Sequence, residues 1–163
     1  MAQRDEVEAW VDAFGREIHA YLWRMLGDAN DAEDCLQETF LRALRSKDGR
    51  PIRAPRAWLY AVATNIARTH FRRRHRRGEV AIDEAEDLPA EDSPESVRDQ
   101  VRAVRRAVER LPGKQQAALV LRRYQGLSYI DIGIALETTP EAARANVYQA
   151  LRKLRALFPE EVR

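Results

Sequence analysis

Apolar residues recur at the spacing of an amphipathic α-helix along most of this 163-residue chain, and no segment alternates like a half-buried strand. In the first segment, one apolar stripe runs from Val7 to Met25 at helical spacing. Glycine and proline number only seven each, so few residues interrupt helices. The sequence therefore predicts an all-α fold.

Local start and stop signals divide the first half into three predicted helices. The first ends near Gly27, and we expect Asn30 to cap the second, with Glu33 in the capping-box position. The third starts at Pro55 and runs into a series of arginines, with Trp58 on its inward face. A three-helix unit is the simplest arrangement of these elements.

The second half carries signals for four more helices. One starts at Ser93-Pro94 and packs through a face of valines that begins at Val97, and Leu111-Pro112 separates it from the next. The last two, Tyr129 to Leu136 and Pro140 to Phe158, are separated by a short turn. This arrangement is typical of a helix-turn-helix.

The formal net charge is only +2, but the charged residues are distributed unevenly along the chain. The formal charge is +4 over residues 1–77, −8 over 78–99 and +6 over 100–163, and Arg50 to Arg77 contains nine arginines and no acid. A GC-rich genome would explain why arginine is used instead of lysine, but not why it clusters. The clustering indicates a polyanionic partner, most simply nucleic acid.

The acidic segment contains Pro89 and has little apolar periodicity, so we interpret residues 78–95 as a flexible linker. It separates a predicted N-terminal helical domain, 1–77, from a C-terminal helix-turn-helix domain, 96–163. A length of 163 residues is near the smallest that supports two separate cores. The expected architecture is thus two small helical domains.

Several classes of protein are not expected. The N-terminus, MAQRDEVEAW, lacks the apolar core of a secretory signal, and no apolar run approaches 18 residues, so we expect a cytoplasmic protein without membrane insertion. A single cysteine, Cys35, excludes an internal disulfide, and three histidines are too few for a structural zinc site. No phosphate-binding glycine loop, HExxH motif or Ser/His/Asp set is present, so we expect no catalysis and no cofactor.

The terminal helix has a polar face opposite its packed stripe. That face carries Glu141, Ala145, Tyr148, Gln149 and Arg152, flanked by Arg144 and Arg155. The second helix of a helix-turn-helix enters the major groove, where such side chains reach base edges and phosphates. The alternative is the solvated face of an ordinary helix pair.

The third helix offers a second polar surface. Its predicted outward face carries Tyr60, Thr64, Arg68, Phe71 and Arg72, and more arginines follow. Aromatic rings stack on unpaired bases while guanidinium groups hold the backbone, as in single-strand binding. The alternative is that Tyr60 and Phe71 pack on a neighbouring helix.

The second helix presents a mostly charged outer face. It comprises Asp34, Gln37, Glu38, Leu41, Arg42 and Arg45. An exposed Leu41 inside a charged rim indicates a protein-binding spot, although single exposed leucines are common. Asp31, Asp34 and Glu38 would also suit a metal, but the helix dipole alone favours acids in the first turns.

Three motifs together resemble the bacterial RNA polymerase sigma factors of the extracytoplasmic-function type. Residues 31–43, DAEDCLQETFLRA, resemble the family's polymerase-binding helix, and residues 58–74, WLYAVATNIARTHFRRR, its promoter-melting helix. LPGKQQAALVLRRYQGLSYIDIGIAL and TPEAARANVYQALRKLR resemble its second domain. The resemblance covers nearly the whole chain in the family's order.

The resemblance implies a non-enzymatic initiation factor whose partners are core RNA polymerase, double-stranded and melted promoter DNA, and an anti-sigma factor. The residues it assigns to polymerase binding are Asp31, Asp34, Gln37, Glu38, Leu41 and Arg42. Those for the minus-ten element are Trp58, Tyr60, Asn65, Arg68, Phe71, Arg72 and Arg73. Those for the minus-thirty-five element are Thr139, Glu141, Arg144, Ala145, Tyr148, Gln149 and Arg152.

Three positions depart from the family pattern. Thr69 replaces an acid four residues after Asn65, Gln116 stands where arginine is usual, and Glu137 stands where the turn commonly has glycine. A side chain at position 137 must adopt whatever φ the turn requires. A stand-alone helix-turn-helix regulator, which needs only the second domain, stays open as the alternative.

Overall fold

The computed structural model describes residues 2–46, 51–76 and 97–159, and every regular element in these ranges is an α-helix. The elements are α1 (Ala2–Leu26), α2 (Ala29–Arg45), α3 (Pro55–Arg76), α4 (Val97–Glu109), α5 (Gly113–Arg123), α6 (Tyr129–Ala135) and α7 (Pro140–Leu157). The all-α prediction is confirmed. The predicted linker over 78–95 and the predicted helix start at Ser93-Pro94 lie outside the described residues.

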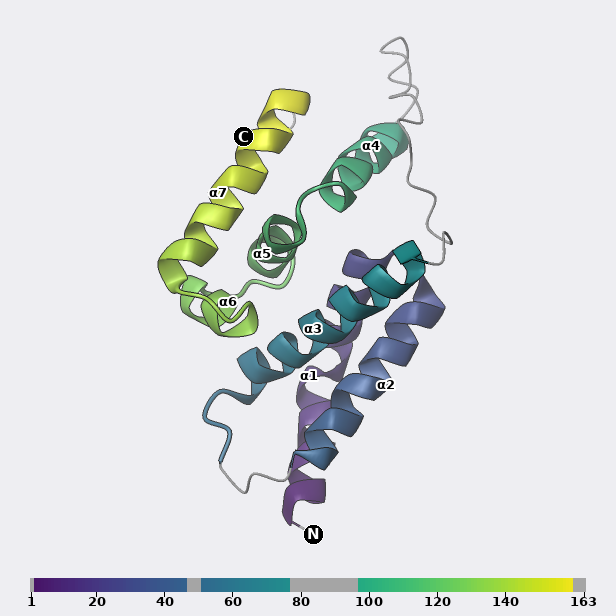
Figure 1. The fold of residues 1–163 in the computed structure, drawn as a ribbon, viewed down its shortest axis with the longest axis vertical. Coiled ribbons are helices and arrows are strands. Elements are labelled where there is room, and N and C mark those ends of the chain that lie inside the picture. Colours follow the sequence, from purple (N-terminus) through teal and green to yellow (C-terminus); the bar gives the residue numbers. More distant parts are fainter. Residues whose placement is uncertain (1, 47–50, 77–96, 160–163) are drawn as a thin grey trace.

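Helices α1, α2 and α3 pack on one another and form what we term the N-terminal unit (Figure 1). The chain turns between α1 and α2 at Gly27, whose φ of +71° favours glycine. The next residue, Asp28, is extended, and its carboxylate accepts a hydrogen bond of 2.9 Å from the Asp31 amide. The prediction that Asn30 caps α2 was wrong, because the turn closes at Gly27 and places Asn30 inside the first helical turn.

Two aromatic pairs hold α3 against α1. Trp10 and Trp58 have ring centroids 6.2 Å apart. Tyr21 meets Tyr60 edge-on at 5.2 Å, and its hydroxyl lies 2.8 Å from Thr64 Oγ1. Because Tyr21 is fully buried, loss of hydration raises its pKa. The N-terminal unit therefore has a polar pair sealed inside an apolar core.

Helices α4 to α7 form the C-terminal unit, in which α5 and α6 both pack against α7. Ser128 caps α6 and Thr139 caps α7, each through a side-chain hydrogen bond of 3.1 Å to a backbone amide. A Cβ at Gly133 would lie 3.0 Å from the Thr138 carbonyl oxygen, so glycine allows α6 to approach the start of α7 closely. The predicted helix-turn-helix is present, with Glu137 in its turn at a φ of +55°.

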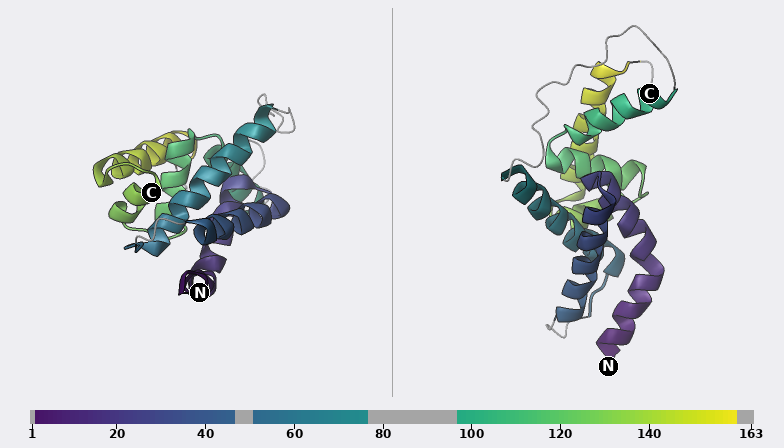
Figure 2. Two further views of the ribbon diagram at one scale, coloured as in Figure 1. Left: turned by 60° about the horizontal axis from the view of Figure 1, so that its bottom comes forward. Right: turned by 90° about the vertical axis from the view of Figure 1, so that its right-hand side faces the viewer.

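The two units pack against each other, with α3 against α6 and α1 against α5. Figures 1 and 2 show the C-terminal unit lying along α3. Buried apolar residues of both units join in one cluster, from Val7 in α1 to Leu154 in α7. The predicted outward face of α3 is therefore buried at Tyr60 and Thr64 and exposed at Phe71 and Arg72.

Helix α4 is the element least covered by its neighbours. Val108 is buried and Val104 packs on the core, but Val97 and Val101 are 75% and 60% exposed. The predicted packed face of valines is thus correct only for the C-terminal half of this helix. Among the described residues, no helix combines the length and apolar character needed to cross a membrane.

Candidate protein and nucleic-acid interfaces

The outer face of α2 keeps an apolar residue inside a polar rim. Leu41 is 42% exposed, and Asp34, Gln37 and Arg42 are exposed around it. Glu38 pairs with Arg42 one helical turn later, at 3.2 Å. This surface is available for contact with another protein.

Asp31 is already engaged within the fold. One carboxylate oxygen accepts a 2.6 Å hydrogen bond from Arg74, and the other lies 3.2 Å from His70 Nε2. The first turn of α2 is thereby tied to the C-terminal part of α3. Asp31 supports the shape of the α2 surface and offers little free carboxylate to a partner.

Cys35 lies behind this surface and is buried. Burial, followed by the nearby Asp31, Asp34 and Glu38, raises the pKa of its thiol to about 11. The neutral thiol is therefore favoured, which makes Cys35 a packing residue rather than a nucleophile. In the part of the chain that the structure describes, no group of three or more His, Cys, Asp or Glu side chains is placed to hold a metal ion.

The predicted outward face of α3 needs a correction at Tyr60 and Thr64. Both are buried, Tyr60 against Tyr21 and Thr64 through its bonds to the Tyr21 hydroxyl and to the Tyr60 carbonyl, the latter at 2.6 Å. The alternative interpretation, packing on a neighbouring helix, is correct for Tyr60. The reason is that α3 packs against three helices, α1, α2 and α6, so a single inward stripe does not describe it.

Trp58, like Tyr60, was assigned to the minus-ten element but lies mainly in the core. It is partly buried and packs against Trp10. Phe71, by contrast, is 48% exposed, and Arg72 and Arg73 next to it are exposed. The accessible part of α3 is therefore its C-terminal half.

Asn65 and Arg68 occupy the boundary between the units. Asn65 Nδ2 lies 3.4 Å from Glu137 Oε1 in the helix-turn-helix. The guanidinium of Arg68 lies beside Gly113, at the start of α5. Thr69 donates to the Asn65 carbonyl at 3.0 Å, so its hydroxyl is satisfied within the helix.

Gln125, in the turn after α5, joins the two units most extensively. Its side-chain nitrogen donates to the Tyr60 hydroxyl at 2.9 Å and to the Glu17 carbonyl at 2.8 Å. Its carbonyl groups accept from Arg24 at 3.2 Å and Arg56 at 3.1 Å. This role could not be predicted from the sequence, because Gln125 lies 65 positions from Tyr60 and 69 from Arg56, too far for any local pattern to indicate the contacts.

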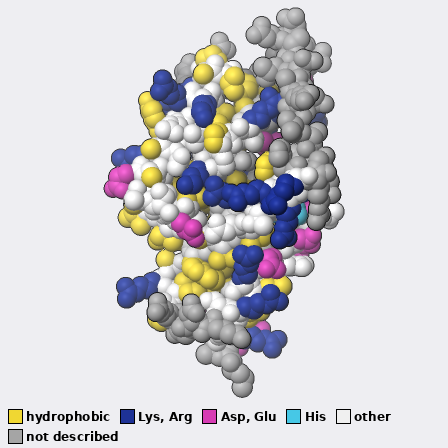
Figure 3. Space-filling view, in the orientation of Figure 1, with side chains coloured by type: hydrophobic (Ala, Val, Ile, Leu, Met, Phe, Trp, Pro, Cys, Tyr) yellow, Lys and Arg dark blue, Asp and Glu magenta, His cyan; other side chains and the backbone are white. Residues whose placement is uncertain are grey.

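A basic surface spans the boundary between the units. Figure 3 shows a band of Lys and Arg side chains across one face, over α5 and the C-terminal part of α3. Arg72, Arg73 and Arg76 on α3 and Lys114 on α5 are exposed. Such a band attracts a phosphate backbone.

The outer face of α7 is exposed along its length. Its exposed residues are Glu141, Arg144, Ala145, Tyr148, Gln149 and Arg152. Thr139 is also exposed, but its hydroxyl caps the helix, and Gln149 Oε1 accepts a 3.0 Å hydrogen bond from Gln115 on α5. The middle of α7 therefore presents Tyr148, 61% exposed, as its largest accessible side chain.

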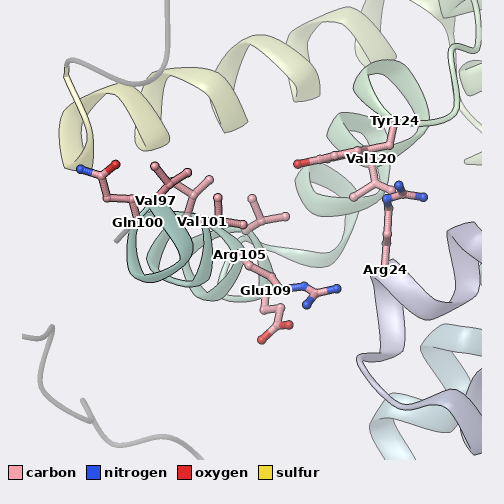
Figure 4. Close-up of a pocket in the computed structure, with 10 residues that line it drawn as sticks. Arg24, Val97, Gln100, Val101, Arg105, Glu109, Val120 and Tyr124 are labelled. Carbon is pink, nitrogen blue, oxygen red and sulfur yellow. The ribbon is translucent and has the colours of Figure 1, made fainter. Parts of the chain in front are cut away.

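An apolar groove of about 520 Å³ runs beside α4 (Figure 4). Val97, Val101 and Val120 line it, and Arg24 and Tyr124 stand at one end. A second hollow, of about 370 Å³, lies between the units and is lined in part by Phe71 and Gln116. Gln116 itself is buried, so the departure from arginine at this position places a neutral side chain at the boundary.

Family models match both units of the chain. The model described as Sigma-70 region 2 matches residues 10–77, and the model described as Sigma-70, region 4 matches residues 101–154. These ranges cover the helices α2 and α3 of the first unit and α5 to α6 of the second, with most of α1, α4 and α7.

Curated proteins and solved structures are similar over most of the chain. The RNA polymerase sigma-H factor of Pseudomonas aeruginosa is 31% identical over 90% of this chain and 83% of its own length. The ECF RNA polymerase sigma factor SigE of Mycolicibacterium smegmatis is 33% identical over 85% of this chain, which spans only 56% of SigE. The sigma factor RpoE in complex with the anti-sigma factor NepR, from Bartonella quintana, shares the fold with a TM-score of 0.71 at 20% identity, covering 96% of this chain and 98% of that one.

Proposed function

Because the chain belongs to the sigma-70 family of RNA polymerase sigma factors, in its extracytoplasmic-function group, we propose that it binds core RNA polymerase and directs it to promoter DNA. The observation that carries this proposal is the exposed polar face of α7, in a helix-turn-helix that region 4 matches. A helix so placed fits the major groove. The proposal includes the two-domain division, 1–77 and 96–163.

In this proposal, the outer face of α2 binds core RNA polymerase. Its contact residues in this proposal are Asp34, Gln37, Glu38, Leu41 and Arg42, with Asp31 holding the helix against α3. A few well-packed residues near the centre of an interface carry most of its binding energy, and Leu41 has that position on this surface. The relatives' names identify them as RNA polymerase sigma factors, in keeping with this partner.

Recognition of the minus-thirty-five element falls to α7. Glu141, Ala145, Tyr148 and Gln149 face base edges in this proposal, while Arg144 and Arg152 supply positive charge for phosphates or guanine. Thr139 sets the start of the helix through its cap. A protein that acts in this way binds and positions DNA, and it needs no catalytic group of its own.

Minus-ten binding falls to the C-terminal half of α3. Asn65, Arg68, Phe71, Arg72 and Arg73 supply one ring, one amide and three guanidinium groups for an unpaired strand. Stabilising a melted strand in this way requires no ATP. Since residues of the C-terminal unit contact Asn65 and Arg68 in this structure, the two units must separate before the whole surface meets DNA.

An anti-sigma factor is the further partner that we propose. The similar solved structure is titled as a sigma factor in complex with an anti-sigma factor. The groove beside α4 leaves Val97 and Val101 uncovered, and this apolar surface is where we expect such a partner to pack.

Reconstituted transcription tests the proposal. Purified chain is added to core RNA polymerase on a library of promoter fragments, and transcripts are sequenced. We expect a defined set of start sites that core polymerase alone does not produce. Sequence-specific DNA binding without any new start site would favour the stand-alone regulator instead.

A further inference from the structure

Two arginines from different helices lie over one tyrosine ring in the helix-turn-helix. The guanidinium carbon of Arg122, in the last turn of α5, lies 4.3 Å from the centroid of the Tyr129 ring. That of Arg144, in the second turn of α7, lies 5.0 Å from the same centroid. Tyr129 is the first residue of α6, so this cluster joins three helices of the C-terminal unit.

The arrangement brings two positive charges together without a carboxylate between them. In the described part of the chain, neither Arg122 nor Arg144 forms an ion pair. Arg122 donates one hydrogen bond of 3.0 Å to the Leu127 carbonyl, and the side chains of Arg122 and Arg144 are both exposed. The negative face of the ring offsets part of the repulsion and leaves most guanidinium donors free. An anion bound between the two guanidinium groups would neutralise their charge and accept hydrogen bonds from their free donors.

The position of the cluster identifies the anion. Arg144 belongs to the exposed face of α7, and Tyr129 is on α6, the helix that precedes the recognition helix and crosses the DNA backbone in a helix-turn-helix. Arginine forks match phosphate oxygens, and phosphate contacts fix the register of the protein on the duplex. We propose that Tyr129 is a positioning residue that holds Arg122 and Arg144 as a preformed pair for backbone phosphates of the DNA. This inference rests on the proposed function and extends it to two residues, Arg122 and Tyr129, outside the reading face.

The test uses the full chain and a fluorescently labelled duplex of mixed sequence, with affinity measured between about 50 and 200 mM salt. Arg122→Ala and Arg144→Ala should each lower the slope of log affinity against log salt by about one. Tyr129→Leu should weaken binding by about twofold to fivefold per lost stack and lower the slope, whereas Tyr129→Phe, which keeps the ring, should bind like the wild type. Arg106→Ala, which removes an exposed charge on α4, is the matched control and should change the slope least.

A double-mutant cycle separates positioning from general damage to the fold. If Tyr129 acts through the arginines, Tyr129→Leu should weaken DNA binding much less when Arg122 and Arg144 are already alanine. Thermal midpoints of all variants, measured by circular dichroism, show whether Tyr129→Leu stays folded. If Tyr129→Leu does not fold, Arg144→Lys serves as the second variant, because it keeps the positive charge but lacks the planar group that stacks on the ring.

Three outcomes would overturn the inference. Wild-type affinity and slope in Tyr129→Leu would remove Tyr129 from DNA binding while leaving both arginines in place. Equal losses in Tyr129→Phe and Tyr129→Leu would assign the effect to the hydroxyl and not to stacking. Wild-type binding by both arginine variants would show that the cluster meets no phosphate, and directed transcription with core polymerase would then still decide the proposed function separately.

Discussion

Gln125, in the turn between α5 and α6, donates a hydrogen bond of 2.9 Å to the hydroxyl of Tyr60 on α3. Together with the contacts of Arg24, Arg56 and Asn65, this bond joins the C-terminal unit to α1 and α3. Burial raises the pKa of Tyr60 to about 12, so the phenol stays neutral and keeps its proton in this contact. Gln125 thus forms several of the polar contacts between the two units, alongside the packing of α3 on α6 and of α1 on α5.

The first prediction concerns that side chain. Gln125→Ala removes the bonds to Tyr60, Glu17 and Arg24 and leaves buried groups unsatisfied, which should weaken the contact between the units by about 1–3 kcal/mol. We expect a larger radius of gyration in small-angle scattering. Gln115→Ala is the matched control, because Gln115 bonds only within the C-terminal unit. Identical scattering from Gln125→Ala and wild type would show that the other contacts between the units hold them together without this side chain.

The second prediction concerns the turn of the helix-turn-helix. Glu137 has a φ of +55°, a conformation that costs a side-chain-bearing residue about 1–2 kcal/mol. Glu137→Gly relieves this strain but adds freedom to the unfolded chain, so we expect a net gain of about 0.5–1 kcal/mol in unfolding free energy. Urea unfolding measures it. Glu141→Gly, inside α7, should lose stability, and a loss at position 137 as well would mean that the bond to Asn65 outweighs the strain.

The third prediction concerns polymerase binding. Leu41→Asp places a charge in the centre of the α2 surface and should weaken binding to core RNA polymerase by about 2 kcal/mol or more, with the fold intact. Fluorescence titration with core polymerase measures the affinity. Val11→Asp is the matched control, since Val11 on α1 is 44% exposed, like Leu41, and lies outside the proposed surface. If both variants bind equally well, α2 is not the docking helix.

The fourth prediction contrasts two glycines in helices. A Cβ at Gly133 would lie 3.0 Å from the Thr138 carbonyl oxygen and 3.2 Å from Pro140, both of them backbone, so Gly133→Ala should destabilise the protein by about 1–3 kcal/mol. A Cβ at Gly15 meets only Val11 at 3.8 Å, so Gly15→Ala should stabilise α1 by about 0.5–1 kcal/mol. Thermal unfolding measures both. Shifts of the same sign would contradict the close approach of α6 and α7.

The fifth prediction concerns stability at high pH. Burial raises the pKa of both Tyr21 and Tyr60. The folded chain therefore binds these phenol protons more tightly than the unfolded chain, in which tyrosine has a pKa of about 10. Their stabilisation is fully present below about pH 10 and is lost as the pH rises toward 12. Urea midpoints across this range measure the loss.

Tyr21→Phe is the control for this pH dependence. Thr64 keeps its 2.6 Å bond to the Tyr60 carbonyl, so the substitution leaves no donor without a partner. The variant should lose stability less steeply above pH 10, because one buried phenol no longer titrates. Parallel curves for the variant and the wild type would show that other groups govern alkaline unfolding.

Residues close together in the sequence are enough to predict the helices and most of their ends. The stripe of Ala143, Val147, Ala150 and Leu154 on α7 is buried as its spacing predicts, and Thr139 caps that helix. These features depend on residues three or four positions apart, which the helical geometry places together whatever the rest of the chain does. For the same reason, the three motifs that resemble sigma factors can be identified from the sequence alone.

The burial of α3, in contrast, could not be predicted from local sequence patterns. A stripe of Trp58, Val62 and Ile66 identifies one inward face, but α3 packs against α1, α2 and α6, and a second face is buried in part by residues far away in the chain. Tyr60 meets Gln125 across 65 positions and Asn65 meets Glu137 across 72. Such contacts leave no periodic pattern in the sequence, because they depend on how the two units fit in space and not on the spacing of residues within either helix.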